Sequence, residues 1–363
     1  MAEAAPRVTA VIREEIRALA AYHVPPAQGL VKLDAMENPY TWPPEMVAEW
    51  LRLLERVAVN RYPDPGAEAL KARLREAMGV PEGAGILLGN GSDEIIQILA
   101  LAAGGPRRAV VAPEPGFVMY RMIATFCGLG YRGVPLRAED FALDVGAMRA
   151  ALREARPALV FLAAPNNPTG NLFDEAALRA VIEAAPGLVV VDEAYAPFAD
   201  FTAMGWLAEY PHLLVMRTVS KLGLAGLRLG LLAGDPAWIA ELEKVRLPYN
   251  VNVLTQVSAE FALRHGEVFA AQTAAIRAER ARLHGALAAV AGVRVWPSRA
   301  NFLLFRVPAG RAGEVFEGLR TRGVLVKNLD GSHPLLADCL RVTVGRPEEN
   351  DAFLAALEAV LGA

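Results

Sequence analysis

The stretch LVVVDEAY at residues 188–195 decides the fold, because an apolar run there passes directly into Asp192 and Glu193. Four consecutive apolar residues bounded by Gly187 and by acids predict a buried strand. Comparable short apolar runs occur at 109–112, 159–163, 213–217 and 229–233. Longer amphipathic stretches are interspersed with them, at 93–103, 145–154 and 174–185. This alternation of strands and helices predicts an α/β domain with a mostly parallel central sheet.

The pattern changes near residue 250. One long helix is expected over 253–290, and a last helix over 347–361. Strand-like segments between these helices lie at 293–296, 301–307, 324–327 and 340–344. We therefore predict three parts, namely an N-terminal arm or helix over residues 1–40, a large α/β domain over 41–250 and a smaller C-terminal α+β domain over 251–363.

Composition narrows the class of protein. Hydrophobic residues make up 54% of the chain and charged residues 21%, which is typical of a globular protein. The net charge of -3 argues against sequence-independent binding of nucleic acid. The apolar runs are too short to cross a bilayer, and the first twenty residues lack the apolar core of a signal peptide. We expect no nucleic-acid partner and no membrane insertion.

Cysteine and histidine usage points to an intracellular protein without a metal site. Cys127 and Cys339 are the two cysteines, and they cannot form a disulfide framework. A reducing cytoplasm fits this usage. The five histidines share no metal-ligand spacing, so we expect no bound metal.

A glycine turn stands directly before a predicted helix in LGNGSDE, residues 88–94. Free backbone N–H groups and the positive end of the helix dipole suit a phosphate at such a helix start. The candidates for phosphate contact are Gly91, Ser92 and Asp93. A glycine turn with an ordinary serine or aspartate cap explains the same letters, and both interpretations stay open at this point.

Two strand ends carry polar groups that could face a ligand, although PNNPTG by itself could be merely a tight turn in a loop. Asn167, in PNNPTG after the strand at 159–163, can donate a hydrogen bond into the crevice where open α/β sheets bind ligands. Asp192 ends a buried strand, where an isolated carboxylate is costly unless a cation or several donors meet it. The functional interpretation is a salt bridge to the protonated ring nitrogen of a cofactor; the alternative is a solvated strand end.

The next strand ends in RTVSK, residues 217–221. Val219 and Leu222 flank Lys221, and desolvation by such neighbours lowers the pKa of an amine and makes it nucleophilic. Ser220 and Arg228 would then supply a hydroxyl and a bidentate guanidinium to a phosphate.

Over essentially its whole length the chain resembles the fold-type I aminotransferases that depend on pyridoxal 5′-phosphate (PLP), through NNPTG, DEAY and SK before GLRLG. The resemblance implies a fold-type I PLP-dependent transferase. It implies that Lys221 carries the cofactor as a Schiff base and shuttles a proton at the substrate's α-carbon. Asp192 would keep the pyridine nitrogen protonated, and Tyr195 and Asn167 would hydrogen-bond the ring hydroxyl.

The same resemblance assigns the remaining cofactor contacts. The phosphate would be held by Gly91, Ser92, Asp93, Ser220 and Arg228. Phe117, in PGFVMY, matches the aromatic residue that stacks on the ring. Tyr62, in RYPDP, matches a residue that reaches the phosphate of the neighbouring subunit, which implies a homodimer with shared active sites.

Further segments resemble histidinol-phosphate aminotransferases, namely LDAMENP at 33–39, RYPDP at 61–65, DEAYAPF at 192–198 and LRVTVG at 340–345. That family converts L-histidinol phosphate and 2-oxoglutarate to imidazole-acetol phosphate and L-glutamate in histidine biosynthesis. Arg341 matches the arginine that binds the substrate phosphate in one half-reaction and the glutamate carboxylate in the other. Tyr22, Glu37 and Asn167 match positions that line the substrate pocket.

Two features depart from the family's pattern. Lys327 stands where many relatives have a second phosphate-binding arginine, and it keeps the charge but not the planar fork. Lys221 and Arg228 are seven residues apart, one fewer than in many relatives.

Other functions remain as alternatives. A PLP-dependent aromatic amino-acid aminotransferase or a threonine-phosphate decarboxylase would share this fold, and an aspartate-specific transaminase fits the histidinol-type segments less well. A catalytically silent relative acting as a regulator or binding module is disfavoured, because Lys221, Asp192 and Tyr195 are all present.

Overall fold

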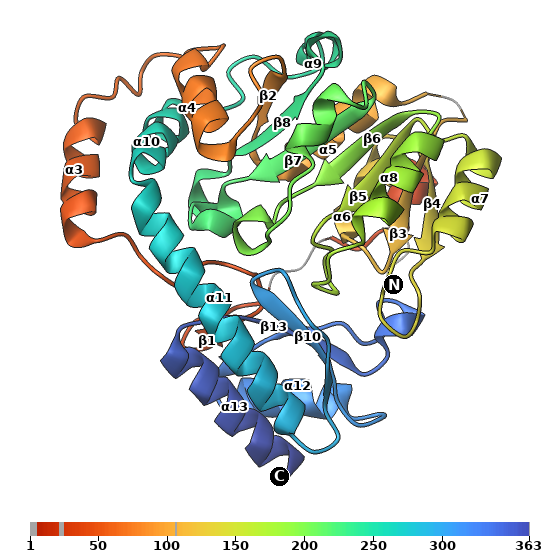
Figure 1. Cartoon of the computed structure of the whole chain (residues 1–363), viewed down its shortest axis with the longest axis vertical. Coiled ribbons are helices and arrows are strands. Elements are labelled where there is room, and N and C mark those ends of the chain that lie inside the picture. The colour runs from red at the N-terminus through yellow and green to blue at the C-terminus, as the bar shows by residue number, and fades with distance from the viewer. Residues whose placement is uncertain (1–5, 22–24, 106, 363) are drawn as a thin grey trace.

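The computed structural model describes residues 6–21, 25–105 and 107–362. Its largest element is a seven-stranded sheet in the order β2-β8-β7-β6-β5-β3-β4 (Figure 1). The strands are β2 (Gly85–Gly89), β3 (Ala109–Glu114), β4 (Gly130–Pro135), β5 (Leu159–Ala163), β6 (Leu188–Asp192), β7 (Leu213–Thr218) and β8 (Gly230–Gly234). Strand β8 runs antiparallel to both β2 and β7, and the other described pairs of this sheet are parallel, so the predicted mostly parallel sheet is confirmed.

Helices cover both faces of this sheet. One face packs on α4 (Glu68–Met78), α7 (Val145–Ala155), α8 (Glu175–Ala184) and α10 (Val253–Arg264). The other packs on α5 (Gly91–Ala103), α6 (Val118–Phe126) and α9 (Pro236–Glu243). Alternate residues of β6 enter opposite layers, with Val189 and Val191 in the first and Leu188 and Val190 in the second. Burial on both faces explains why the central strands are continuous apolar runs.

A second, smaller core lies in the lower part of Figure 1. Its four-stranded sheet has the order β12-β13-β10-β9. The strands are β9 (Arg294–Val295), β10 (Phe302–Arg306), β12 (Lys327–Asn328) and β13 (Cys339–Thr343). Helices α12 (Ala312–Thr321) and α13 (Pro347–Leu361) pack on it, and α11 (Gly266–Ala289) joins it to the large body.

The N-terminal segment contributes short elements. Helices α1 (Pro6–Val11) and α2 (Glu14–Arg17) precede β1 (Val31–Lys32), and α3 (Pro44–Leu54) follows it. Strand β1 pairs in parallel with β11 (Val324–Leu325) and so attaches this segment beside the smaller core.

Two expectations differ from the structure. The single helix expected over 253–290 is two helices, because the backbone of His265 (φ -101°, ψ 43°) leaves the helical region between α10 and α11. The strand expected over 324–327 is split at Val326 into β11 and β12, which pair with different partners.

The change of core also lies further along the chain than residue 250. Helix α10 and Phe269 of α11 pack on the large sheet, whereas Ile276 of α11 packs in the smaller core. The three-part division stays a prediction of domain limits.

Candidate active site

Strands β5, β6 and β7 end side by side, with Ala163, Asp192 and Met216 in register. A cavity of about 220 Å³ opens near these ends. Most residues that the sequence predicted for the site line it, namely Glu37, Ser92, Asp93, Phe117, Asn167, Asp192, Tyr195, Ser220, Lys221 and Arg228. Parallel strands bring their carboxyl ends to one edge of a sheet, which is why segments far apart in sequence meet here.

Asp192 is one of the carboxylates that line this cavity, together with Glu37 and Asp93. Its Oδ2 accepts a hydrogen bond from the Tyr120 hydroxyl at 2.6 Å, and its Oδ1 accepts one from the Ala194 N–H at 3.0 Å. Burial raises the pKa of Asp192 to about 6. The carboxylate is therefore a buried acceptor, suited to a cationic N–H donor in the same cavity.

Lys221 follows β7 in a single turn of 3₁₀ helix, Ser220–Leu222. Its Nζ donates to the Ala35 carbonyl at 3.3 Å and lies 5.9 Å from the centre of the Tyr195 ring. Burial lowers the pKa of Lys221 to about 8, and the positive charge of Arg341 acts in the same direction. A lysine with this pKa has a sizeable neutral fraction near neutral pH and can act as a nucleophile.

A chain of side chains leads from Tyr195 to Arg341. The Asn167 amide donates to the Tyr195 hydroxyl at 3.1 Å, and the Arg341 guanidinium donates to the Asn167 Oδ1. Arg341 also donates to the Asp34 carbonyl at 3.1 Å. Lys327 is the register partner of Arg341 in the β12–β13 pair. Directly opposed residues share one face of a sheet, so the two cations lie on the same side.

The start of α5 forms the end of the cavity that suits a phosphate. Gly91 has φ +76°, and a Cβ there would come within 2.8 Å of the Arg228 guanidinium. A Cβ on Gly230 would come within 2.8 Å of the Ser92 nitrogen. Arg228 also approaches Asp93 at 3.5 Å, so the short loop after Lys221 still brings it to the helix start. Unpaired helix N–H groups beside a guanidinium are an anion site, and this geometry fits a phosphate.

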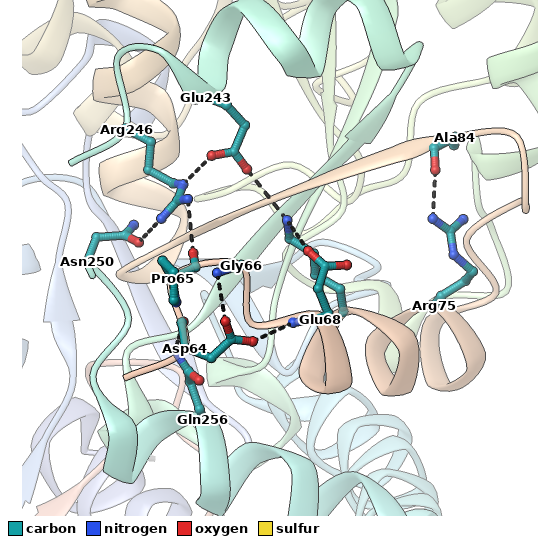
Figure 2. Close-up of polar contacts among 11 residues, drawn as sticks. Asp64, Pro65, Gly66, Glu68, Arg75, Ala84, Glu243, Arg246, Asn250 and Gln256 are labelled. Carbon is teal, nitrogen blue, oxygen red and sulfur yellow. Dashed lines mark hydrogen bonds and ion pairs between the residues drawn. The ribbon is translucent and has the colours of Figure 1, made fainter. Parts of the chain in front are cut away.

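Tyr62 lies outside the cavity of its own chain. Its side chain is 81% exposed and stacks on Tyr249 with ring centroids 4.5 Å apart. Figure 2 shows how the segment after it is anchored: Asp64 accepts from the N–H groups of Gly66 and Glu68, and Arg246 donates to the Pro65 carbonyl at 3.2 Å. Tyr22 lies outside the described residues.

A larger groove of about 540 Å³ lies beside β6 and β7 and includes Glu193 and Arg217. Arg217 pairs with the Glu193 carboxylate at 2.6 Å and donates to the Met78 carbonyl and the Thr202 hydroxyl. These polar groups satisfy one another, whereas the smaller cavity contains the lysine, the carboxylate and the helix start. The smaller cavity is therefore the candidate site.

Residues 28–357 match the family model described as aminotransferase class I and II. The chain belongs to this aminotransferase family. It is 60% identical over 353 residues to histidinol-phosphate aminotransferase 2 of Nitrosococcus oceani, covering 97% of this chain and 98% of that relative. It is 59% identical over 356 residues to histidinol-phosphate aminotransferase 2 of Cupriavidus pinatubonensis, covering 97% and 96%.

The fold agrees with a solved aminotransferase structure. The histidinol-phosphate aminotransferase of Sinorhizobium meliloti, solved in complex with pyridoxal 5′-phosphate, superposes with a TM-score of 0.86 at 24% identity, covering 97% of this chain and 98% of that one. The predicted aminotransferase family and the predicted fold class are confirmed.

Two side chains of this aminotransferase site were missed in the sequence. Tyr120, in PGFVMY, was not predicted as a site residue, although its three-residue spacing from Phe117 at a helix start is a signal that both lie on one side. Met36 has φ +54° and lines the cavity, where its sulfur accepts from the Tyr195 hydroxyl at 3.2 Å. No residue pattern in LDAMENP indicates that contact.

Proposed function

We propose that this aminotransferase moves the amino group of L-histidinol phosphate to 2-oxoglutarate, which yields imidazole-acetol phosphate and L-glutamate in histidine biosynthesis. The observation that carries the proposal is the 60% identity to a histidinol-phosphate aminotransferase over 97% of the chain. The site supports it, because Lys221 lines the cavity and the buried Arg341, which can bind a phosphate or a carboxylate, donates to Asn167 in the cavity wall.

Bound PLP supplies an electron sink for the pair of electrons left when the substrate's α-carbon loses its proton. Lys221 would attach the cofactor, and its Nζ, with a pKa near 8, would take and return that proton. Asp192 would hold the proton on the pyridine nitrogen. Asn167 and Tyr195 would orient the ring hydroxyl, and Phe117 would cover one ring face.

The phosphate of the cofactor would be held by the start of α5, with Gly91, Ser92 and Asp93. Ser220 and Arg228 would complete this site from the β7–β8 connection. The glycine at position 91 supports the assignment, because its positive φ and the nearby guanidinium leave no room for a side chain.

Arg341 would bind the phosphate of histidinol phosphate and the side-chain carboxylate of glutamate in turn, since each anion offers two oxygens to one guanidinium. Lys327, on the same sheet face, would add charge to this site. Glu37 lines the cavity and pairs with Lys32, and its carboxylate would receive the imidazole N–H of the substrate.

A homodimer with shared sites is part of the proposal. Five large apolar residues on the segments near Tyr62 and Tyr249 are exposed, and the Tyr62 ring stacks on Tyr249; the five are Val59, Tyr62, Leu247, Tyr249 and Leu254. Exposed clusters of large apolar side chains are typical of interfaces. Tyr62 would reach the phosphate in the partner's site from this surface. A cytoplasmic location is also proposed, because Cys127 and Cys339 are free thiols.

The substrate assignment is tested by the amine half-reaction. The PLP form is mixed separately with L-histidinol phosphate, L-phenylalanine and L-threonine phosphate, and its absorbance is followed as the cofactor accepts the amino group. L-histidinol phosphate is expected to react fastest. A faster reaction with phenylalanine, or release of carbon dioxide from threonine phosphate, would overturn the assignment and favour the corresponding alternative.

A further inference from the structure

Tyr120 contacts the catalytic carboxylate from outside the cavity. It lies in the first turn of α6 and is 2% exposed. Its hydroxyl donates to the Asp192 Oδ2 at 2.6 Å, while the Ala194 N–H donates to the Oδ1 at 3.0 Å. Within the described part of the chain, each carboxylate oxygen therefore accepts one hydrogen bond, and these two bonds fix the plane of the carboxylate.

The ring of Tyr120 is fixed by two aromatic neighbours. It stacks on Phe161 of β5, with centroids 4.5 Å apart and planes 9° apart. It meets Phe117 edge to face at 5.4 Å and 86°. Phe117 lines the cavity, so one buried side chain touches both the acid and the aromatic residue predicted to contact the cofactor ring.

We propose that Tyr120 is a positioning residue for the cofactor, in which the hydroxyl orients Asp192 and the ring supports Phe117. The inference rests on the proposed roles of Asp192 and Phe117. A buried carboxylate keeps its charge only when donors replace water, and Tyr120 is the side-chain donor to Asp192 in the described part of the chain.

Tyr120 is suited to this task because its hydroxyl stays protonated. Burial and the adjacent Asp192 raise the pKa of the Tyr120 phenol well above its ordinary value. The same hydrogen bond, together with the Ala194 N–H, counteracts the burial, Asp93 and Glu193 that favour protonation of Asp192. Loss of the hydroxyl would thus weaken the charge that meets the ring nitrogen.

The test is Tyr120→Phe, which removes the hydroxyl and keeps the ring. The matched control is Tyr131→Phe, at a tyrosine of the neighbouring strand β4 that packs against the same core without lining the cavity. PLP dissociation constants are measured by equilibrium dialysis, and melting of the cofactor-free proteins is recorded in parallel. A hydrogen bond to a charged group predicts binding at least about 10-fold weaker in Tyr120→Phe. Tyr131→Phe should stay within about twofold of the wild type.

A double-mutant cycle separates positioning from a general loss of structure. In an Asp192→Asn background, Tyr120→Phe should change the PLP dissociation constant by less than about twofold, because its effect passes through the carboxylate. The same loss in both backgrounds, or wild-type binding by Tyr120→Phe, would overturn the positioning role. A wild type that does not bind PLP would contradict the cofactor assignment itself. When the wild type binds PLP, the variants test only the role of Tyr120.

Discussion

Lys221 and Asp192 face one cavity, and burial moves their pKa values toward each other. The pKa of Lys221 falls to about 8 and that of Asp192 rises to about 6, with burial as the main cause in both. Between these values the acid is ionised and a growing fraction of the lysine is neutral. A nucleophilic amine and an anionic acceptor can therefore coexist near neutral pH.

The lowered pKa of Lys221 predicts the pH dependence of cofactor uptake. Only the neutral amine attacks the aldehyde of PLP, so the rate should rise with pH and level off above about 8. An unperturbed lysine would keep gaining rate toward its ordinary pKa of 10.5. Stopped-flow absorbance of cofactor-free protein mixed with PLP from pH 6 to 10 measures this, and a rate that still rises above pH 9.5 would contradict it.

Arg341 is expected to serve both substrates. Arg341→Ala should raise the KM for L-histidinol phosphate and for L-glutamate by about 10- to 100-fold each, because a charge-assisted contact is lost in both half-reactions. Steady-state kinetics in both directions provide the measurement, with Arg294→Ala, at an exposed residue of β9, as the control. An increase for only one substrate would indicate two separate anion sites.

At the scale of elements, the site depends on how a strand and a helix start approach each other. Strand β8 passes so close to α5 that a Cβ on Gly230 would come within 2.8 Å of the Ser92 nitrogen. Gly91 begins α5 in the left-handed region and faces Arg228. The glycines at positions 91 and 230 are therefore required by the backbone conformation and by the close approach of β8 to α5, not by a chemical group that they supply.

Gly91→Ala should destabilise the turn at the start of α5. A non-glycine residue at φ +76° costs about 1–3 kcal/mol, and the new methyl group would also displace the Arg228 guanidinium. We expect a lower melting temperature and weaker PLP binding, measured by calorimetry and dialysis. Gly83→Ala is the matched control, because a Cβ there meets nothing within 4 Å. Equal behaviour of the two variants would contradict the account of this turn.

At the scale of the whole molecule, exposed apolar side chains lie on the segments that carry Tyr62 and its stacking partner Tyr249. Leu247 is 71% exposed and Val59 is 72% exposed. Arg246 donates to the Pro65 carbonyl and to Asn250, so the segment that carries Tyr62 is held to the β8–α10 region (Figure 2). An anchored apolar surface of this kind is suited to a second copy of the chain.

Leu247→Asp should therefore convert a dimer to a monomer. Light scattering coupled to gel filtration should give twice the 38.9 kDa chain mass for the wild type and the single chain mass for the variant. Val11→Asp, at an equally exposed residue of α1, should leave the dimer intact. A monomeric wild type would contradict the proposed assembly.

Features that depend on residues close together in the sequence could be predicted, and features that depend on tertiary packing could not. Strands β5, β6 and β7 could be predicted, because strands buried on both faces consist of unbroken apolar runs. Asp192 stands at the end of β6, and Lys221 follows shortly after β7. The break at His265 was not predicted, because no proline interrupts residues 253–290 and Gly266 alone is a weak sign of a helix end. The contact of Tyr120 with Asp192 spans 72 residues and depends on the tertiary packing of α6, which no local pattern encodes.

The most direct test asks which amine holds the cofactor. The wild type is loaded with PLP, reduced with sodium borohydride and digested, and the labelled peptide is identified by mass spectrometry. The account predicts a pyridoxyl group on Lys221 and the loss of this label in Lys221→Ala. A label on another lysine of the wild type, or unchanged labelling in Lys221→Ala, would contradict the placement of the cofactor opposite Asp192.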